Sequence, residues 1–168
     1  MLPKVDIKPV GIDGGIVKYL DAPEAPIPVK LLDLWKEKCA KGQTAIPCRH
    51  SFDPREMMGD LPYIYVLDVH EGASDFTMRL FGTGLVAIFG KDYTGIQLSN
   101  TPAEGRWRGE AFRKAALARE PLFSIFKCCD ENEVVFFTEN IFLPMMAADG
   151  ETLMLLCASE VIDDPEKS

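Results

Sequence analysis

The stretch Leu80–Gly95, LFGTGLVAIFGKDYTG, contains four glycines and decides between two folds. From Gly82, its residues GTGLVA fit the loose G-x-G-x-x-G/A pattern of a dinucleotide-binding loop. Such a loop needs a buried parallel strand before it and a full helix after it. Here the preceding segment, Asp75–Phe81, alternates apolar and polar residues as an antiparallel strand does, and Gly90 interrupts the following helix. The glycines therefore indicate sharp backbone turns rather than a phosphate-binding loop.

The segments on either side of this stretch set the order of strands and helices. Before it, Tyr63–Val69 and Asp75–Phe81 are strand-like and are joined by a glycine-containing loop of hairpin length. After it come a helix that begins at Asn100-Thr101-Pro102 and three strand-like segments separated by turn residues. Those segments are Leu122–Cys128, Val134–Met146 and Thr152–Ile162. The order predicts an α+β fold, with one five-stranded antiparallel sheet and helices packed on one face.

An additional amphipathic helix is predicted near the N-terminus, before the hairpin in sequence. Pro26 and Pro28 introduce it, and Gly42 follows its last turn as a stop signal. Its apolar stripe is formed by Leu31, Leu32, Trp35 and Cys39. We therefore expect an arm over residues 1–26 with one short strand at 16–20, one domain over 27–162, and a polar tail over 163–168. Within that domain, the helix covers 27–41 and the core covers 53–162.

The composition is that of a globular domain. The chain has 168 residues, of which 47% are hydrophobic and 26% charged, and its formal net charge is −8. The negative charge argues against nucleic acid and anionic membrane surfaces as partners. No apolar run reaches the roughly 18 residues that span a bilayer, and the N-terminus lacks a signal-peptide pattern. A cytoplasmic location is expected, because the five cysteines (Cys39, Cys48, Cys128, Cys129 and Cys157) show no C-x-x-C spacing and fit reduced thiols.

The pattern Gly-Thr-x-Leu-x-x-x-Phe-Gly-Lys-Asp-Tyr-Thr-Gly over residues 82–95, between a hairpin and a long helix, resembles a PAS domain. More specifically, it resembles the stand-alone PAS-like family common in α-proteobacteria. Further matching pieces are Leu31 to Trp35, Asp53-Pro54, Leu61-Pro62, Phe142-Leu143-Pro144 and Asp149-Gly150. The resemblance covers roughly residues 27–161. It implies a sensory or interaction module that holds a small ligand or cofactor between the inner sheet face and the middle helices.

The candidate pocket residues are apolar side chains on the elements that should face each other: Phe76, Met78, Leu80, Phe89, Trp107, Phe112 and Phe126. The same side chains could instead form a filled core. Arg79 lies between Met78 and Leu80 in the same strand, and its side chain could face either the inside or the outside of the sheet. Facing inward, it would anchor a carboxylate or phosphate. The alternation of its neighbours favours the outward position, where it would pair with a nearby acid.

The cofactor is left unknown by the sequence. The resemblance implies that a haem-binding member would carry a histidine on the long middle helix, but His50 and His70 lie elsewhere. It also implies that a flavin photosensor would carry a reactive cysteine in the helical middle, and none occurs between Cys48 and Cys128. We therefore expect neither a His-ligated haem nor a cysteinyl-flavin adduct, while non-covalent flavin stays open. No residues show metal-ligand spacing.

Three functions remain open. The first is a cytoplasmic, non-enzymatic sensor of a small molecule, which acts on a signalling partner because no output domain follows Ile162. By the resemblance it would dimerise through the helix at 27–41, and the candidate residues are Leu31, Leu34, Trp35 and Lys38. The second is a protein-interaction adaptor with a filled core. The third is a small cone-fold isomerase or lyase using Asp68, Asp75, Tyr63 and Tyr65, although such folds place their long helices first.

Overall fold

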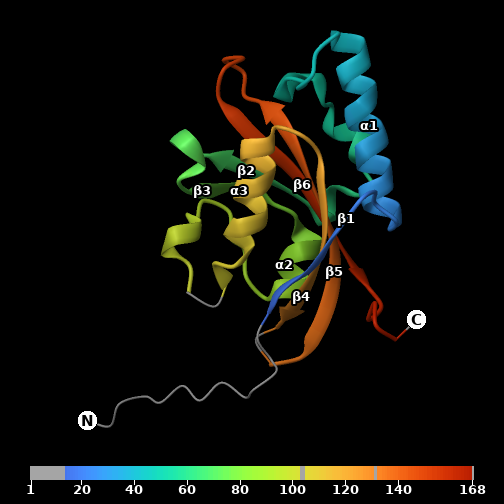
Figure 1. The fold of residues 1–168 in the computed structure, drawn as a ribbon, viewed down its shortest axis with the longest axis vertical. Coiled ribbons are helices and arrows are strands. Elements are labelled where there is room, and N and C mark those ends of the chain that lie inside the picture. Colours follow the sequence, from blue (N-terminus) through green and yellow to red (C-terminus); the bar gives the residue numbers. More distant parts are fainter. Residues whose placement is uncertain (1–13, 103–104, 131, 168) are drawn as a thin grey trace.

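A computed structural model describes residues 14–102, 105–130 and 132–167, which form one sheet with helices on both faces (Figure 1). The six strands are β1 (Gly15–Leu20), β2 (Ile64–Val69), β3 (Phe76–Phe81), β4 (Leu122–Cys129), β5 (Val135–Met146) and β6 (Leu153–Ile162). Their order across the sheet is β1-β4-β5-β6-β2-β3, and each neighbouring pair is antiparallel. The predicted α+β fold with an antiparallel sheet is confirmed, with six strands rather than five.

The sixth strand is the short one expected in the N-terminal arm. β1 pairs with β4 from Gly15 opposite Lys127 to Leu20 opposite Phe123, so this part of the arm is an edge of the sheet. The register shifts between Ile16 and Lys18. Residues 1–13 of the predicted arm lie outside the described residues, and residues 21–25 lead from β1 into α1.

The helices are α1 (Pro26–Gly42), α2 (Thr83–Phe89) and α3 (Arg108–Ala118). α2 and α3 lie on one side of the sheet, the inner face, while α1 packs against β5 and β6 on the other side, the outer face (Figure 1). The expected helix at Asn100-Thr101-Pro102 is shorter than predicted. Its α-helical part begins at Arg108, and residues 103 and 104 lie outside the described residues.

The sheet itself supplies hydrogen-bond acceptors at the N-terminus of α1. The N-cap residue, Ala25, has no side chain that can accept a hydrogen bond from the first turn. Instead, the backbone N–H groups of Glu24 and Ala25 donate to Oε2 of Glu139 on β5, at 3.0 and 2.8 Å. The N–H of Ile27 lies close enough to the Glu160 carboxylate on β6 to lower the pKa of that group. Two carboxylates therefore take the place of a cap and compensate the positive end of the helix dipole.

α1 is also held to the outer face by packing. Leu31, Leu32 and Trp35 are buried there against residues of the sheet such as Ile141 and Leu156. The indole Nε1 of Trp35 donates to the carbonyl oxygen of Pro144 at 2.8 Å, so the polar atom of this buried ring is satisfied. Lys38 is buried as well, and its Nζ lies 2.9 Å from the carboxylate of Glu56.

The glycines of the Leu80–Gly95 stretch shape the backbone, as the sequence indicated. A methyl group at Gly82 would overlap the backbone of Pro62, because the two chains approach closely there. Gly90 ends α2 with φ at 80°, a left-handed conformation that favours glycine. Since α2 has only seven residues and β3 is antiparallel to β2, the dinucleotide-loop pattern has neither of its structural requirements.

Candidate functional site: a cavity on the inner face

A cavity of about 740 Å³ lies between the inner face of the sheet and the helices that cross it. Its walls come from β2 to β6, from α2 and the start of α3, and from the connection between those helices. Six predicted pocket residues line it: Phe76, Met78, Phe89, Trp107, Phe112 and Phe126. These six residues come from β3, α2, the segment before α3, α3 and β4.

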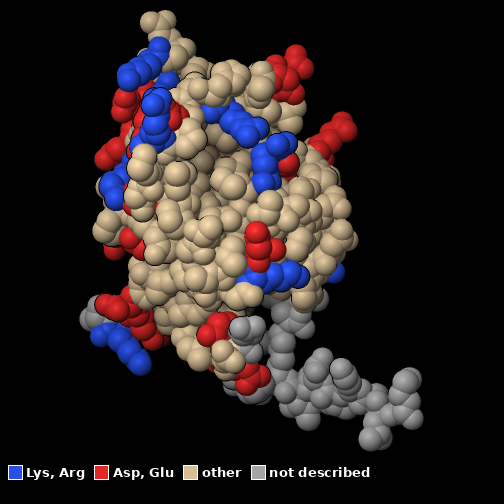
Figure 2. Space-filling view, turned by 180° about the vertical axis from the view of Figure 1, so that it is seen from behind, with Lys and Arg blue, Asp and Glu red and all other residues tan. Residues whose placement is uncertain are grey.

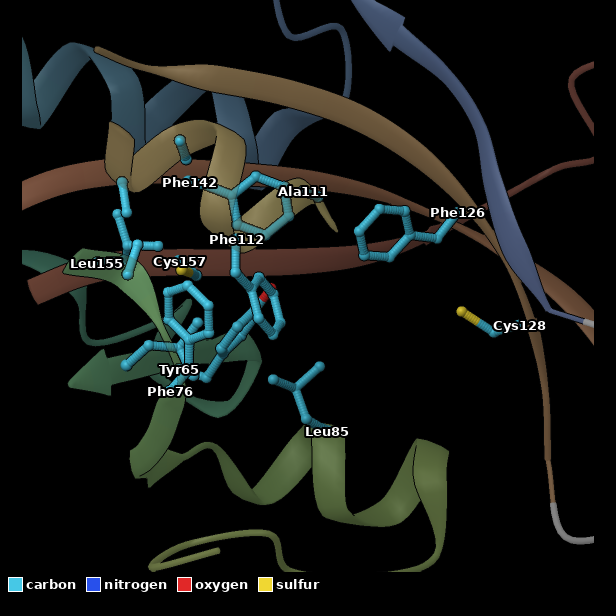
Figure 3. Close-up of a cluster of buried hydrophobic side chains, with 14 residues drawn as sticks. Tyr65, Phe76, Leu85, Ala111, Phe112, Phe126, Cys128, Phe142, Leu155 and Cys157 are labelled. Atoms are coloured by element: carbon cyan, nitrogen blue, oxygen red, sulfur yellow. The ribbon is translucent and has the colours of Figure 1, made fainter. Parts of the chain in front are cut away.

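Aromatic rings pack edge to face along this wall. The ring centroid of Phe112 on α3 lies 5.5 Å from that of Phe76 and 5.6 Å from that of Phe142. Figure 3 shows Phe76 and Phe112 close together, with Leu85 pointing toward them from α2. Trp107 packs against Phe126 at a centroid distance of 4.8 Å. Such contacts hold the rings in fixed positions around the cavity rather than leaving them free to collapse into it.

Two predicted pocket residues, Arg79 and Leu80, lie on the outer face. Val66 of β2 pairs with Leu80, while Leu67, the next residue, pairs with Met78. Arg79 is therefore an extra residue in β3, a β-bulge, and the alternation of side chains changes there. The inclusion of Leu80 in the pocket was wrong for this reason, and it is 46% exposed. Phe81 takes the inward position and lines the cavity instead.

Arg79 occupies the outward position that the alternation favoured. Its Nε donates to Oδ1 of Asp68 at 2.8 Å, across the outer side of β2 and β3. Both side chains are partly exposed to solvent. The pair is a surface ion pair, so Arg79 does not anchor a ligand in the cavity.

A cluster of buried polar side chains, which the sequence interpretation missed, forms part of the wall. Thr138 and Asn140 of β5 and Ser159 of β6 all line the cavity, and each is at most 5% exposed. Oδ1 of Asn140 accepts from Oγ of Ser159 at 2.6 Å and from Oγ1 of Thr138 at 3.2 Å. Alternate residues of a strand point to the same face, but Glu139 lies between Thr138 and Asn140, so the three consecutive polar residues give no alternation that marks one face. The sequence also does not say which face is buried.

The hydroxyl group of Tyr65 on β2 lies beside this cluster. Burial raises the pKa of Tyr65 well above its ordinary value, and interactions with Cys157 and Ser159 contribute less. Burial also raises the pKa of the Cys157 thiol. Both groups therefore stay neutral at physiological pH, and the cluster as a whole carries no charge.

The charged residues that line the cavity belong to its other elements. The Arg108 guanidinium, at the start of α3, lies 4.3 Å from the ring centroid of Trp107 and 5.5 Å from that of Phe89. Its Nη2 lies 3.6 Å from Sγ of Cys128. Asp130 and Glu133, in the connection between β4 and β5, also contribute to the lining.

The four candidates of the enzyme alternative do not meet in one site. Only Tyr65 lines the cavity, and Asp68 lies on the outer face with Arg79. Burial raises the pKa of Asp75, but hydrogen bonds from Ser99 and from the N–H of Phe76 outweigh it, and the pKa lies below its ordinary value. Asp75 is thus a carboxylate that holds Ser99, with Oγ at 2.6 Å, rather than a general base with a raised pKa.

The described histidines and cysteines do not cluster as metal ligands do. His70 bonds Oγ1 of Thr77 at 2.7 Å, and His50 lies 3.2 Å from Sγ of Cys48. Cys128 and Cys157 are buried, as expected for core thiols. Within residues 14–102, 105–130 and 132–167, no three His, Cys, Asp or Glu side chains are grouped to hold a metal ion.

The four dimer candidates lie on α1, but three of them are buried. Leu31 and Trp35 pack against the outer face of the sheet and Lys38 pairs with Glu56, whereas Leu34 is half-buried. The view from behind shows Lys and Arg mixed with Asp and Glu over α1 rather than in a stripe of one sign (Figure 2). None of the described helices is both long enough and apolar enough to cross a bilayer.

Comparison with solved structures shows a shared fold. A light-oxygen-voltage domain from work on a flavin analogue has 11% identity and a TM-score of 0.51, over 67% of this chain and 85% of that chain. The Aureochrome1 light-oxygen-voltage domain has 9% identity and a TM-score of 0.48, over 67% and 90%. An RNA-binding light-oxygen-voltage receptor has 15% identity and a TM-score of 0.45, over 88% and 37%. At these identities the first similarity concerns the fold alone.

No curated protein sequence matches the chain. A family model described as "PAS domain", however, matches residues 25–159, from the N-cap of α1 to the cavity-lining serine of β6. No enzyme family is indicated, and the predicted resemblance to PAS domains is confirmed. Since this match covers most of its length, the chain belongs to the PAS domain family and has a sensory signalling fold.

Proposed function

We propose that this PAS domain senses a small molecule held in the inner-face cavity and signals through a partner protein. The observation that carries the proposal is the cavity of about 740 Å³, with apolar walls and one buried polar cluster. Ligand sites are typically clefts or cavities of about 300–1,000 Å³ with this mixture of apolar walls and a few fixed polar groups.

The cavity also favours a sensor over an adaptor with a filled core. Protein interiors are closely packed, and voids larger than a water molecule are few. A cavity of about 740 Å³ is therefore typical of a ligand site rather than of a filled core.

A non-covalently bound flavin is one candidate occupant. The similar light-oxygen-voltage domain is named in connection with a flavin analogue. This chain carries no cysteine between Cys48 and Cys128, so α2, α3 and the segment between them have no thiol for a covalent adduct. The visible absorption spectrum of the purified protein tests this candidate directly.

Native mass spectrometry and a thermal-shift screen of small molecules test the proposal, with two matched variants. Met78→Trp places a large side chain in the cavity, whereas Leu80→Trp places the same side chain on the exposed outer face of β3. We expect the wild type and Leu80→Trp to bind a small molecule and Met78→Trp to lose that binding while staying folded. A wild type that carries and binds none, or undiminished binding by Met78→Trp, would count against the sensor.

A homodimer, a cytoplasmic location and membership of the α-proteobacterial stand-alone group stay predictions. Of the four dimer candidates, Leu34 is the one that retains partial exposure. Light scattering of the wild type and of Leu34→Glu tests the dimer. We expect the wild type to have twice the mass of one chain and the variant to have less, and a monomeric wild type would contradict the prediction.

A further inference from the structure

The orientation of the Asn140 amide follows from its neighbours. Its Nδ2 lies 3.1 Å from the carbonyl oxygen of Thr138 and 3.4 Å from that of Ser124. Carbonyl oxygens can only accept hydrogen bonds, so the NH₂ group must face them. The reversed amide would bring Oδ1 against two other acceptors. Its Oδ1 therefore faces the hydroxyl groups of Thr138 and Ser159.

That orientation fixes the hydrogens of both hydroxyl groups. Oδ1 of Asn140 carries no hydrogen, so Thr138 and Ser159 must each donate their single hydroxyl hydrogen to it. The four hydrogen-bonding positions of Asn140 are then all filled within the protein. Toward the cavity, the two hydroxyl groups can therefore only accept hydrogen bonds, through their oxygen lone pairs. Each oxygen has two, so one remains on Ser159 even where Tyr65 donates to it.

The acidic groups of the lining lie further along the strands. Asp130 and Glu133 precede Val135, the first residue of β5, and Thr138 lies three residues further along that strand, about 10 Å. The cation Arg108 lies nearer, because its Nη2 is 3.6 Å from Sγ of Cys128 and that sulfur is 3.8 Å from Oγ1 of Thr138. The polar cluster itself is an uncharged acceptor surface beside aromatic rings.

We infer that the cavity selects a flat aromatic molecule whose edge carries an N–H or O–H donor directed at the hydroxyl oxygens of Thr138 and Ser159. This inference rests on the proposed function and names the chemical class of its ligand. A molecule that offers only an acceptor at this edge meets the lone pairs of the two oxygens and forms no hydrogen bond with them. The difference of about one hydrogen bond corresponds to roughly tenfold in Kd.

Indole and quinoline are suitable probes, because both are flat bicyclic aromatics of similar size and are neutral at pH 7.5. Indole offers an N–H donor, whereas the ring nitrogen of quinoline is an acceptor. Titrations of isotope-labelled protein followed by NMR give both dissociation constants and locate the shifts at cavity residues such as Met78. For the wild type we expect indole to bind about tenfold more tightly.

The variant Asn140→Leu tests whether Asn140 takes the hydroxyl hydrogens of both Thr138 and Ser159. Without Oδ1, the hydroxyl groups of Thr138 and Ser159 are free to donate into the cavity, so quinoline should gain and the preference for indole should fall to about threefold or less. Ser124→Ala is the control, because the buried Ser124 hydroxyl has no hydrogen-bond partner and does not line the cavity. It should keep the wild-type preference.

Each outcome decides one point. Equal binding of the two probes to the wild type, or tighter binding of quinoline, overturns the inference and leaves the proposed function standing. An unchanged preference in a folded Asn140→Leu also overturns it. If neither probe binds at millimolar concentration, the proposed function fails together with the inference. Should Asn140→Leu not fold, the wild-type ratio alone decides.

Discussion

Glu139 and Glu160 lie directly opposite one another on β5 and β6, and both carboxylates face N–H groups at the start of α1. Two acidic side chains side by side would ordinarily repel each other. The positive end of the α1 dipole and the N–H groups there reduce that repulsion without removing it at Glu160. The pair joins a helix from the start of the chain to the two central strands formed by its last third.

The substitution Glu160→Gln should stabilise the protein at neutral pH. Burial raises the pKa of Glu160, and the charges of Glu139 and Asp60 raise it further. Because the pKa of Glu160 is higher in the folded state, its protonated carboxyl group favours folding at low pH. That contribution is lost as the pH rises through the folded pKa and the group becomes charged. Glutamine keeps an acceptor for the N–H of Ile27 without the charge, so the Tm at pH 7 should rise.

Thermal unfolding between about pH 4.5 and pH 7.5, a range above the ordinary glutamate pKa, measures this effect. The control is Glu37→Gln, because the exposed Glu37 is bonded by Lys41 and its pKa is lowered. Its removal should leave the Tm unchanged or slightly lower at pH 7. A Tm of Glu160→Gln below that of the wild type at pH 7 would show that the charge is favourable there.

Glu139→Ala should loosen the first turn of α1. The substitution removes the acceptor of two N–H groups from a side chain that is only 2% exposed. We expect the free energy of unfolding to fall by about 2 kcal/mol, since bonds to a charged acceptor and helix caps each contribute on this scale. Urea denaturation gives the loss, and hydrogen exchange should show it first at residues 24–29. Glu139→Gln should recover part of it, and a loss of Glu139→Ala below about 0.5 kcal/mol would contradict the capping role.

Trp35→Phe should reduce stability without changing the oligomeric state. The indole is 7% exposed, and its Nε1 donates to the carbonyl oxygen of Pro144. Phenylalanine keeps much of the apolar packing but leaves that carbonyl without its donor, which costs about 1–3 kcal/mol. Urea denaturation and light scattering measure the two properties. A change in mass with unchanged stability would instead place Trp35 at a contact between chains.

Gly82→Ala should disrupt the entry to α2. Its Cβ would overlap the backbone of Pro62, which cannot move away as a flexible side chain can. A loss of more than about 3 kcal/mol, or failure to fold, is expected for strain of this kind. Gly59→Ala is the control, since nothing lies within 4 Å of its Cβ position and its φ is not positive. Equal stability of the two variants would mean that Pro62 yields at little cost.

The order of elements could be predicted from sequence because periodicity, turn residues and proline positions are local signals. That Leu80 points outward, away from the cavity, could not be predicted in the same way. Phe76 and Met78 obey the alternation, and the bulge at Arg79 that breaks it exists only in relation to β2. A single strand carries no record of the register of its neighbour.

Two further features depended on pairing between distant segments. β1 is a strand because β4, more than a hundred residues later, offers it an edge. Thr138 and Asn140 line a cavity because β5 is a central strand covered on both faces. The residue types were visible in the sequence, but their surroundings were set by the tertiary fold.

The sheet places Asn140 and Glu139 on opposite sides of one strand, and their partners Ser159 and Glu160 likewise on the next. The floor of the inner-face cavity and the attachment of the start of α1 are consequently formed by four residues of the same two strands. A displacement of these strands would pass directly to the start of α1, because no further layer of residues lies between them.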